Sequence, residues 1–275
     1  RSRGLGDVYK RQVLENTALS NNEVTGSYSY FGKAHRSTFS YEQLNMNYGI
    51  PGSYEGHIDG VDIKMNKRSQ KYNYHKDILF LDFQTLDVDQ RFISYMHTEN
   101  EKGNLDPSVR MDQKIFSLQS KLAGNHLTVG SLFQYRDFQA RGFYWTPDAE
   151  ELSLAIFGLL ERQIKDLTLQ ISSRAEYLTV IPETSSIYLS NLNNSQVVNR
   201  YYPIFAGAVG IFRSWENWKL SLGTMLTGRA PSIEDLYSDG PHLGTYAYEI
   251  GQPKLGLEKT IGVEASLENS TTKSD

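Results

Sequence analysis

The sequence contains no cysteine in its 275 residues. Disulfide bonds, thiolate metal sites and a cysteine nucleophile are therefore excluded. It also lacks any run of about 18 apolar residues, the length that a membrane-spanning helix requires. The formal charge is only −4 and there is no dense basic run, so the sequence gives no reason to expect a nucleic-acid partner. Motifs of serine hydrolases, zinc proteases and phosphate-binding loops are missing as well, which argues against an enzyme.

Aromatic residues and glycine are plentiful in a chain that is hydrophilic on average. The chain has 18 Tyr, 12 Phe and 22 Gly, with a mean hydropathy of −0.49. This mixture is unusual for a helical protein but is typical of sheets with one apolar and one polar face. A membrane β-barrel has the same mixture, because apolar residues face lipid, polar residues face the lumen and aromatic residues form girdles.

Apolar residues recur at every second position along most of the chain. Leu127, Val129, Phe133 and Tyr135, for example, fall on one face of a single strand. The pattern predicts about eleven strands, many of them near the roughly 9–11 residues that a tilted strand needs to cross a bilayer. Their expected ranges are 23–30, 36–48, 62–76, 88–98, 109–122, 126–138, 150–163, 167–180, 201–214, 218–228 and 258–268.

Short and long connections alternate between these strands. Tight turns are expected at Gly124-Asn125, 164–166 and 214–217, with moderately short ones at 31–35 and 81–87. Long polar or Gly/Pro-rich connections are expected at 49–61, 99–108, 139–149, 181–200 and 229–257. Outer-membrane barrels alternate in this way, with short periplasmic turns and long extracellular loops. The fold class predicted is therefore all-β: an antiparallel transmembrane β-barrel, rather than a soluble propeller or sandwich.

The barrel is expected to be incomplete. Single-chain bacterial barrels have an even number of strands, whereas about eleven are counted here. Residues 1–12 have no strand or helix pattern and resemble a translated sequencing-adaptor tail. We therefore expect residues 13–275 to form a partial barrel domain.

The segment Arg229–Glu268 resembles TonB-dependent outer-membrane receptors. These receptors carry a segment of the form R-A-P-x-x-x-E-L-Y, then G-P-H, then an aromatic-Glu-x-Gly-x-Pro stretch, then L-x-x-E; Asp235 replaces the usual Glu. NYGIPG at 47–52, YMHTENE at 95–101 and FQYRDFQARG at 133–142 resemble the zinc-uptake branch. The family-motif residues are Arg229, Pro231, Leu236, Tyr237, Gly240, Pro241, Glu249, Gly251 and Glu258.

The resemblance implies a 22-stranded barrel in the outer membrane of a Gram-negative bacterium, with about eleven strands in this chain. It also implies an N-terminal plug inside the barrel, energy supplied through TonB and a metal or metal-chelate substrate. We expect the plug and the TonB box to lie outside this chain. Pro231 and Pro253 lie in a stretch rich in turn formers, so much of 229–257 is expected to shape one long loop.

Three residues are the preferred metal ligands of the barrel. His97 and Glu99 are two apart on an expected strand, so their side chains share a face. His242, in the G-P-H stretch, is expected to reach the substrate chamber. Imidazole and carboxylate groups are ligands of zinc. The alternatives are a solvated pair on the polar face and a histidine that only shapes its loop.

A second candidate site is the loop after Pro51. Glu55, His57, Asp59 and Asp62 there form a candidate metal-collecting group. The zinc branch has a His-rich tract in this loop, whereas this chain has one His, which weakens the case for zinc. A flexible acidic loop is the alternative. His35, His75 and His126 are expected to be surface residues near periplasmic turns.

Aromatic residues near strand ends are expected to form the interfacial belts of the barrel. They are Trp215, Trp218, Tyr177, Tyr201 and Tyr202.

Ligand uptake is the leading function, with zinc as the favoured substrate and no resident cofactor. Outer-membrane lipid and TonB are the expected partners. An iron complex is the other expected metal cargo. The second hypothesis is a receptor of the same family for a siderophore, cobalamin or another organic ligand. A barrel enzyme or an adhesin is a minor alternative.

Overall fold

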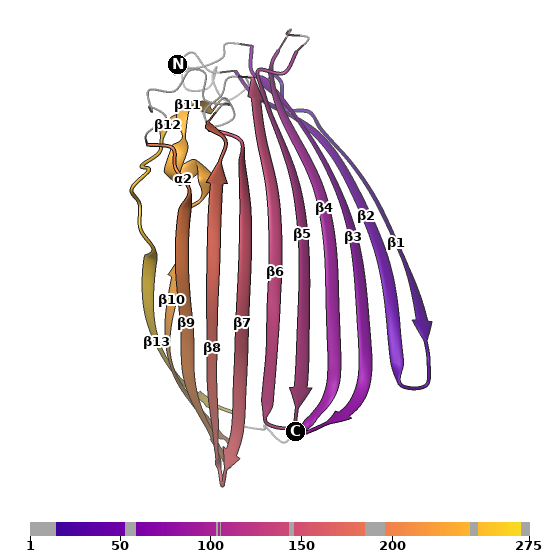
Figure 1. The fold of residues 1–275 in the computed structure, drawn as a ribbon, viewed down its shortest axis with the longest axis vertical. Helices are drawn as coiled ribbons and strands as arrows, with labels where there is room; N and C mark the ends of the chain where they lie inside the picture. Colours follow the sequence, from indigo (N-terminus) through magenta and orange to yellow (C-terminus); the bar gives the residue numbers. More distant parts are fainter. Residues whose placement is uncertain are drawn as a thin grey trace, which may run out of the picture.

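The computed structural model describes residues 15–52, 59–102, 104, 106–142, 146–184, 196–242 and 247–270. For residues 241 and 242 it describes the backbone alone. One large, curved sheet of eleven antiparallel strands dominates the molecule (Figure 1). Their order in the sheet is β1-β2-β3-β4-β5-β6-β7-β8-β9-β10-β13, so each strand lies beside its neighbours in sequence.

Each of the eleven strands is longer than the range predicted for it from the sequence. The longest is β3, with 20 residues, and the shortest have 12. Their bounds are β1 Leu19–Phe31, β2 His35–Ile50, β3 Val61–Phe80, β4 Phe83–Glu101, β5 Val109–Gly124, β6 Leu127–Gly142, β7 Ala149–Ile164, β8 Leu167–Pro182, β9 Arg200–Trp215, β10 Trp218–Arg229 and β13 Glu258–Asn269.

The predicted alternation of connections is confirmed. At one end of the sheet, two or three residues join β1 to β2, β3 to β4, β5 to β6, β7 to β8 and β9 to β10. All the longer connections lie at the other end (Figure 1). The turn expected at 81–87 is shorter than predicted, because β3 reaches Phe80 and β4 begins at Phe83.

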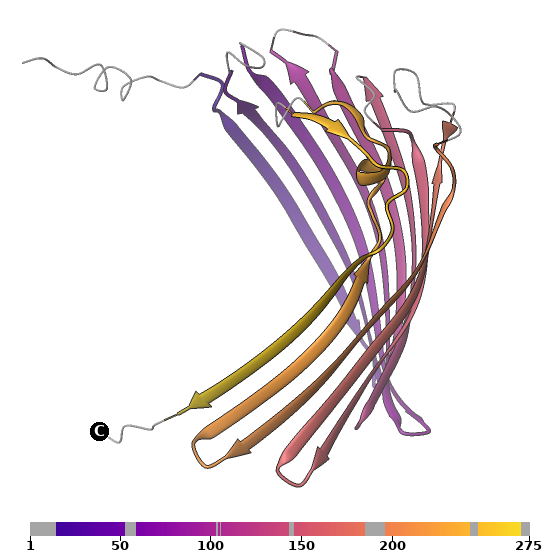
Figure 2. The ribbon, with the colours of Figure 1, turned by 90° about the vertical axis from the view of Figure 1, so that its left-hand side faces the viewer.

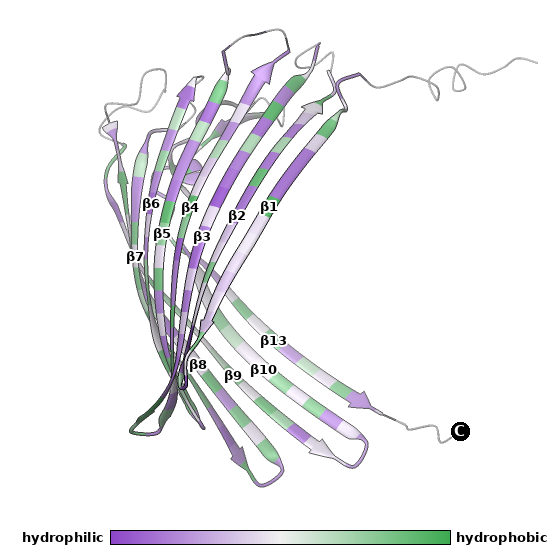
Figure 3. Cartoon of the chain, turned by 90° about the vertical axis from the view of Figure 1, so that its right-hand side faces the viewer, coloured by the Kyte–Doolittle hydropathy of each residue, from purple (hydrophilic) through white to green (hydrophobic). Residues whose placement is uncertain are grey.

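The two faces of the sheet have opposite chemistry. On β7, Leu152, Leu154 and Ile156 lie on the convex face and are 37%, 54% and 67% exposed. Between them, Ser153 and Ala155 lie on the concave face and are 5% exposed. Alternating hydrophobic and hydrophilic bands run along many strands (Figure 3). A soluble protein would bury such an apolar face, so the convex surface is suited to lipid.

A small insertion covers part of the concave face. Between β10 and β13 the chain forms helix α2 (Ile233–Tyr237) and a hairpin of β11 (Asp239–His242) and β12 (Ala247–Ile250). Figure 2 shows α2 inside the curve of the sheet, near the end that carries the long connections. No helix in the described ranges has the length and hydrophobicity needed to cross a membrane.

The capping of α2 explains where this short helix begins. The Ser232 hydroxyl accepts a hydrogen bond from the backbone N–H of Asp235, and the Asp235 carboxylate accepts one from the N–H of Ser232. This reciprocal capping box satisfies two helix N-terminal donors. Ile233, Leu236 and Tyr237 are then buried against Phe138, Val180 and other concave-face residues. The stretch 229–257, predicted as one long external loop, is therefore folded inward.

Candidate metal-binding wall inside the barrel

The strand β4 carries a buried histidine–carboxylate pair on the concave face. The Nε2 atom of His97 lies 2.9 Å from the Oε1 atom of Glu99. His97 is 9% exposed and Glu99 is 1% exposed. The prediction that the two side chains share a face is confirmed, but the alternative of a solvated pair is wrong. Burial matters because a carboxylate removed from water needs a charge or hydrogen-bond partner, and His97 supplies one.

Apolar residues of the neighbouring strands cause this burial. Glu99 pairs in register with Ile63 on β3 and with Val109 on β5, which are 3% and 0% exposed. Two residues before His97 on β4, Tyr95 places its hydroxyl 3.4 Å from the Nδ1 atom of His97. The two nitrogens of the imidazole therefore have different surroundings: a carboxylate at Nε2 and a long phenol contact at Nδ1.

The other predicted ligands do not join this pair in the described part of the chain. Asp62 lies on β3 between Val61 and Ile63, so it faces the opposite side of the sheet. Asp59 lies in the turn before β3. Glu55 and His57 lie outside the described residues, as does the side chain of His242, whose backbone pairs with Ala247 in β11. Within the described ranges, no group of three His, Asp or Glu side chains converges on one point.

The family-motif residues build the inward-folded insertion. Arg229 ends β10 and lies 3.5 Å from both Asp235 and Glu258, which begins β13. Pro231 is buried between β10 and α2, outside any strand pairing, as predicted. The N–H of Gly251 donates a hydrogen bond to the Ser238 carbonyl, which joins the end of β12 to the end of α2. Of the remaining motif residues, Leu236 and Tyr237 are buried in α2, Gly240 and Pro241 lie in β11, and Glu249 lies in β12.

Two tyrosines of the insertion have raised pKa values. Burial raises the pKa of Tyr237 to about 12. The hydrogen bond that Tyr248 donates to the Asp239 carboxylate raises the pKa of Tyr248. Both phenols therefore remain protonated hydrogen-bond donors at neutral pH.

An arginine that the sequence analysis did not single out links the wall to the insertion. Arg136 Nη1 lies 2.9 Å from Glu151 on the next strand, and Nη2 lies 3.9 Å from Glu234 of α2. The guanidinium also lies over the ring of Phe138, 5.0 Å from its centroid. Arg136 and Glu151 are only 16% and 14% exposed, so this pair is protected from water.

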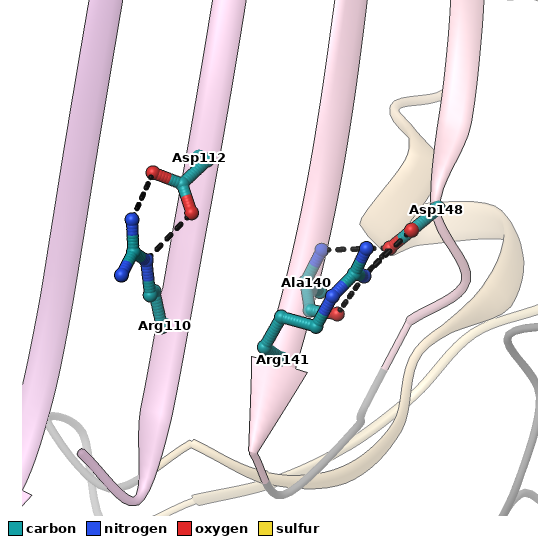
Figure 4. A network of polar contacts seen from close by, with 5 residues as sticks. All are labelled: Arg110, Asp112, Ala140, Arg141 and Asp148. Atoms are coloured by element: carbon teal, nitrogen blue, oxygen red, sulfur yellow. Dashed lines mark hydrogen bonds and ion pairs between the residues drawn. The ribbon is translucent and has the colours of Figure 1, made fainter. Parts of the chain in front are cut away.

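The loop-side ends of β5 and β6 carry further ion pairs (Figure 4). The Asp148 carboxylate accepts hydrogen bonds from the Ala140 N–H and from Arg141, at 2.9 and 2.6 Å. On β5, Arg110 makes two hydrogen bonds to Asp112. Asp148 thereby joins the start of β7 to the end of β6 at the loop-side edge of the sheet.

Most of the predicted belt aromatics lie on the convex face. Trp215 and Trp218 pair across a tight turn and are each 38% exposed, and Tyr177 stacks on Tyr201 with ring centroids 6.4 Å apart. Tyr202 is the exception, because it is 6% exposed and points to the concave face, where its hydroxyl donates to the Leu255 carbonyl. Its assignment to the belt is therefore wrong.

Comparison with known proteins identifies the architecture. The model of the family described as "TonB dependent receptor-like, beta-barrel" matches residues 4–274. The chain belongs to this family. The fold resembles the copper transporter OprC, with a TM-score of 0.76 and 13% identity over 94% of this chain. It also resembles the FrpB iron transporter from Neisseria meningitidis (F3-3 variant), with a TM-score of 0.71 and 12% identity over 94%. No curated protein sequence matches this chain.

The family is one of receptor-like β-barrels and not of enzymes, and membership places the chain in the outer membrane of a Gram-negative bacterium. The concave face is thus the lumen wall and the convex face contacts lipid. The chain covers 44% of the length of each of the two transporters, and the identities show a shared fold alone. In this family the long connections are extracellular, so His97 and Glu99 line the outer part of the lumen.

Proposed function

We propose that the complete receptor containing this chain takes up a metal ion through the barrel lumen. The buried His97–Glu99 pair on the lumen wall carries the proposal. Histidine ligands of metal sites commonly donate their second ring N–H to a carboxylate, which fixes the tautomer and the direction of the lone pair. Glu99 accepting from Nε2–H would leave Nδ1 of His97 as the metal ligand.

Zinc is the ion that this donor chemistry favours first. Zinc binds imidazole nitrogen and carboxylate oxygen, commonly with four ligands in a tetrahedral arrangement. The wall supplies one or two of them. The rest would come from His242 and from the plug that closes barrels of this family, and TonB would supply the energy for release. The copper and iron transporters of similar fold make a metal cargo the natural class to test.

The test is zinc affinity of the complete receptor in detergent, measured for wild type and for His97→Ala, Glu99→Ala and His242→Ala. We expect each substitution to weaken binding by about tenfold or more, since loss of a ligand or of its carboxylate partner has that effect. His75→Ala is the matched control, because His75 also faces the lumen and contacts a carboxylate, that of Asp87, at 2.6 Å. Unchanged affinity in the His97 and Glu99 variants would remove this site from the proposal.

A further inference from the structure

Three of the five methionines of the chain lie in one cross-strand row with His97. The register pairs Met46 with Met65, Met65 with His97, and His97 with Met111. All four residues are on the lumen face of consecutive strands, β2 to β5. The histidine of the proposed uptake site is therefore flanked on both sides by a thioether.

The sheet geometry brings these donors within reach of one ion. Residues directly opposite each other on antiparallel strands have Cβ atoms about 4.5–5.5 Å apart. Methionine has three rotatable side-chain bonds and a polarizable sulfur, so it adapts its reach to a neighbour. Met65 and Met111 can thus place a sulfur on either side of the His97 imidazole. The cross-strand row continues from Met111 to the buried Ala140 on β6. The Ala140 N–H donates a hydrogen bond to Asp148, which fixes this end of the row.

We propose that Met65, His97 and Met111 form a binding site for a soft monovalent metal ion of the Cu(I) class. Thioether sulfur is a preferred donor for Cu(I), whereas zinc sites use thiolate, imidazole and carboxylate. The surrounding wall is apolar, since Val61, Ile63 and Val109 pack against Met65 and Met111. Neutral sulfur donors suit a soft, singly charged ion.

This inference adds a second class of cargo to the proposed function and rests on it for uptake, but the binding step can be tested separately. Packing alone would explain methionines in an apolar wall. Leucine would then serve equally well, because exchange of Met for Leu conserves volume and costs less than about 1.5 kcal/mol. Met65→Leu/Met111→Leu therefore removes both sulfurs and keeps the packing.

The experiment compares the complete receptor with this double variant in detergent. Cu(I) affinity is measured under reducing conditions against a Cu(I)-chelating dye, Ag(I) serves as a redox-inert probe, and Zn(II) affinity is measured in parallel. We expect the double variant to bind Cu(I) and Ag(I) about tenfold or more weakly, because metal sites lose affinity on this scale when a supporting residue is removed. Its Zn(II) affinity should stay within about twofold of wild type. Met96→Leu is the matched control, because Met96 precedes His97 on β4 and faces lipid.

The outcomes separate the two proposals. Cu(I) affinity unchanged in the double variant overturns the thioether site, and so does an X-ray absorption spectrum of the Cu(I)-loaded wild type without sulfur scattering. If His97→Ala weakens zinc binding in that case, the proposed function stands alone. If His97→Ala affects neither metal, both proposals fall. Should the double variant not fold, as judged by the heat-dependent gel shift of barrels, the single variants Met65→Leu and Met111→Leu give the same test.

Discussion

The hydroxyl of Tyr237 donates a hydrogen bond to the backbone carbonyl of Val198, across 2.8 Å and 39 positions of sequence. Tyr237 is 1% exposed and ends helix α2, while Val198 lies just before β9. This bond fastens the inward-folded insertion to a separate extracellular connection. The insertion is therefore a packed part of the lumen wall, and its stability can be tested one contact at a time.

Tyr237→Phe should loosen the insertion slightly, and Tyr237→Ala should loosen it strongly. The first substitution removes one hydrogen bond, worth about 0.5–1.5 kcal/mol, and keeps the ring. The second also removes a buried aromatic side chain, which costs about 3–5 kcal/mol. Protease cleavage within 230–257 of the complete receptor measures the opening. Equal cleavage rates in wild type and Tyr237→Ala would show that the insertion is not packed against the wall.

The raised pKa of Tyr237 predicts a pH range for the same contact. The phenol has a pKa of about 12 in the folded protein, compared with about 10 for an exposed tyrosine. Because the folded state favours the protonated form, its stabilising effect is complete below pH 10 and is lost as the pH rises through 12. Ultraviolet titration of tyrosinate should show one group fewer near pH 12 in Tyr237→Phe. A group missing near pH 10 instead would contradict the burial.

Gly251→Ala should displace the insertion, whereas Gly256→Ala should not. A Cβ at Gly251 would lie 2.6 Å from the Tyr237 backbone nitrogen and 2.7 Å from that of Ser238, so backbone atoms would have to move. At Gly256 no atom lies within 4 Å of the added carbon. The two variants share the same connection between β12 and β13, which makes them a matched pair. Protease sensitivity and zinc affinity of the complete receptor should change in the first variant alone.

Arg136→Ala should destabilise the barrel wall more than Glu234→Gln does. Removal of Arg136 leaves the buried Glu151 carboxylate without its closest cation, and breaking a buried pair in this way costs about 3–5 kcal/mol. Glu234 is 3.9 Å from Arg136 and half-buried, so its loss should cost about 1 kcal/mol or less. The temperature at which the complete receptor loses its heat-dependent gel shift measures both. An equal fall in this temperature in the two variants would contradict the conclusion that Glu151, rather than Glu234, is the main partner of Arg136.

The eleven strands could be predicted because apolar residues recur at every second position within each strand, and turn-forming residues separate one strand from the next. The insertion could not, although Ser232 and Asp235 have the spacing of a capping box, because five helical residues carry too little periodicity to stand out. Tyr201 and Tyr202 were both assigned to the belt because they lie near a strand end. Adjacent residues of a strand face opposite sides of the sheet, so only one of the two can contact lipid, and that residue is Tyr201.

The candidate site was predictable within one strand but not between strands. His97 and Glu99 share a face by the period of a β-strand, whatever their neighbours are. Their burial depends on Ile63 and Val109, and the thioether row depends on Met65 and Met111, all of which lie on other strands. Cross-strand register is set by exact strand ends and turn lengths, which the sequence pattern gives only approximately.

The membrane assignment itself makes a prediction that needs no ligand. Ile156 is 67% exposed on the convex face, and Ser172 of β8 lies on the lumen face. Lysine on the lipid face near the middle of the bilayer costs about 2–4 kcal/mol, while a lumen position retains access to water and polar groups. Ile156→Lys should therefore lower the amount of folded receptor in the outer membrane, and Ser172→Lys should have a much smaller effect. The reverse order would mean that the convex face is not the lipid face, because an exposed lysine in water carries no such cost.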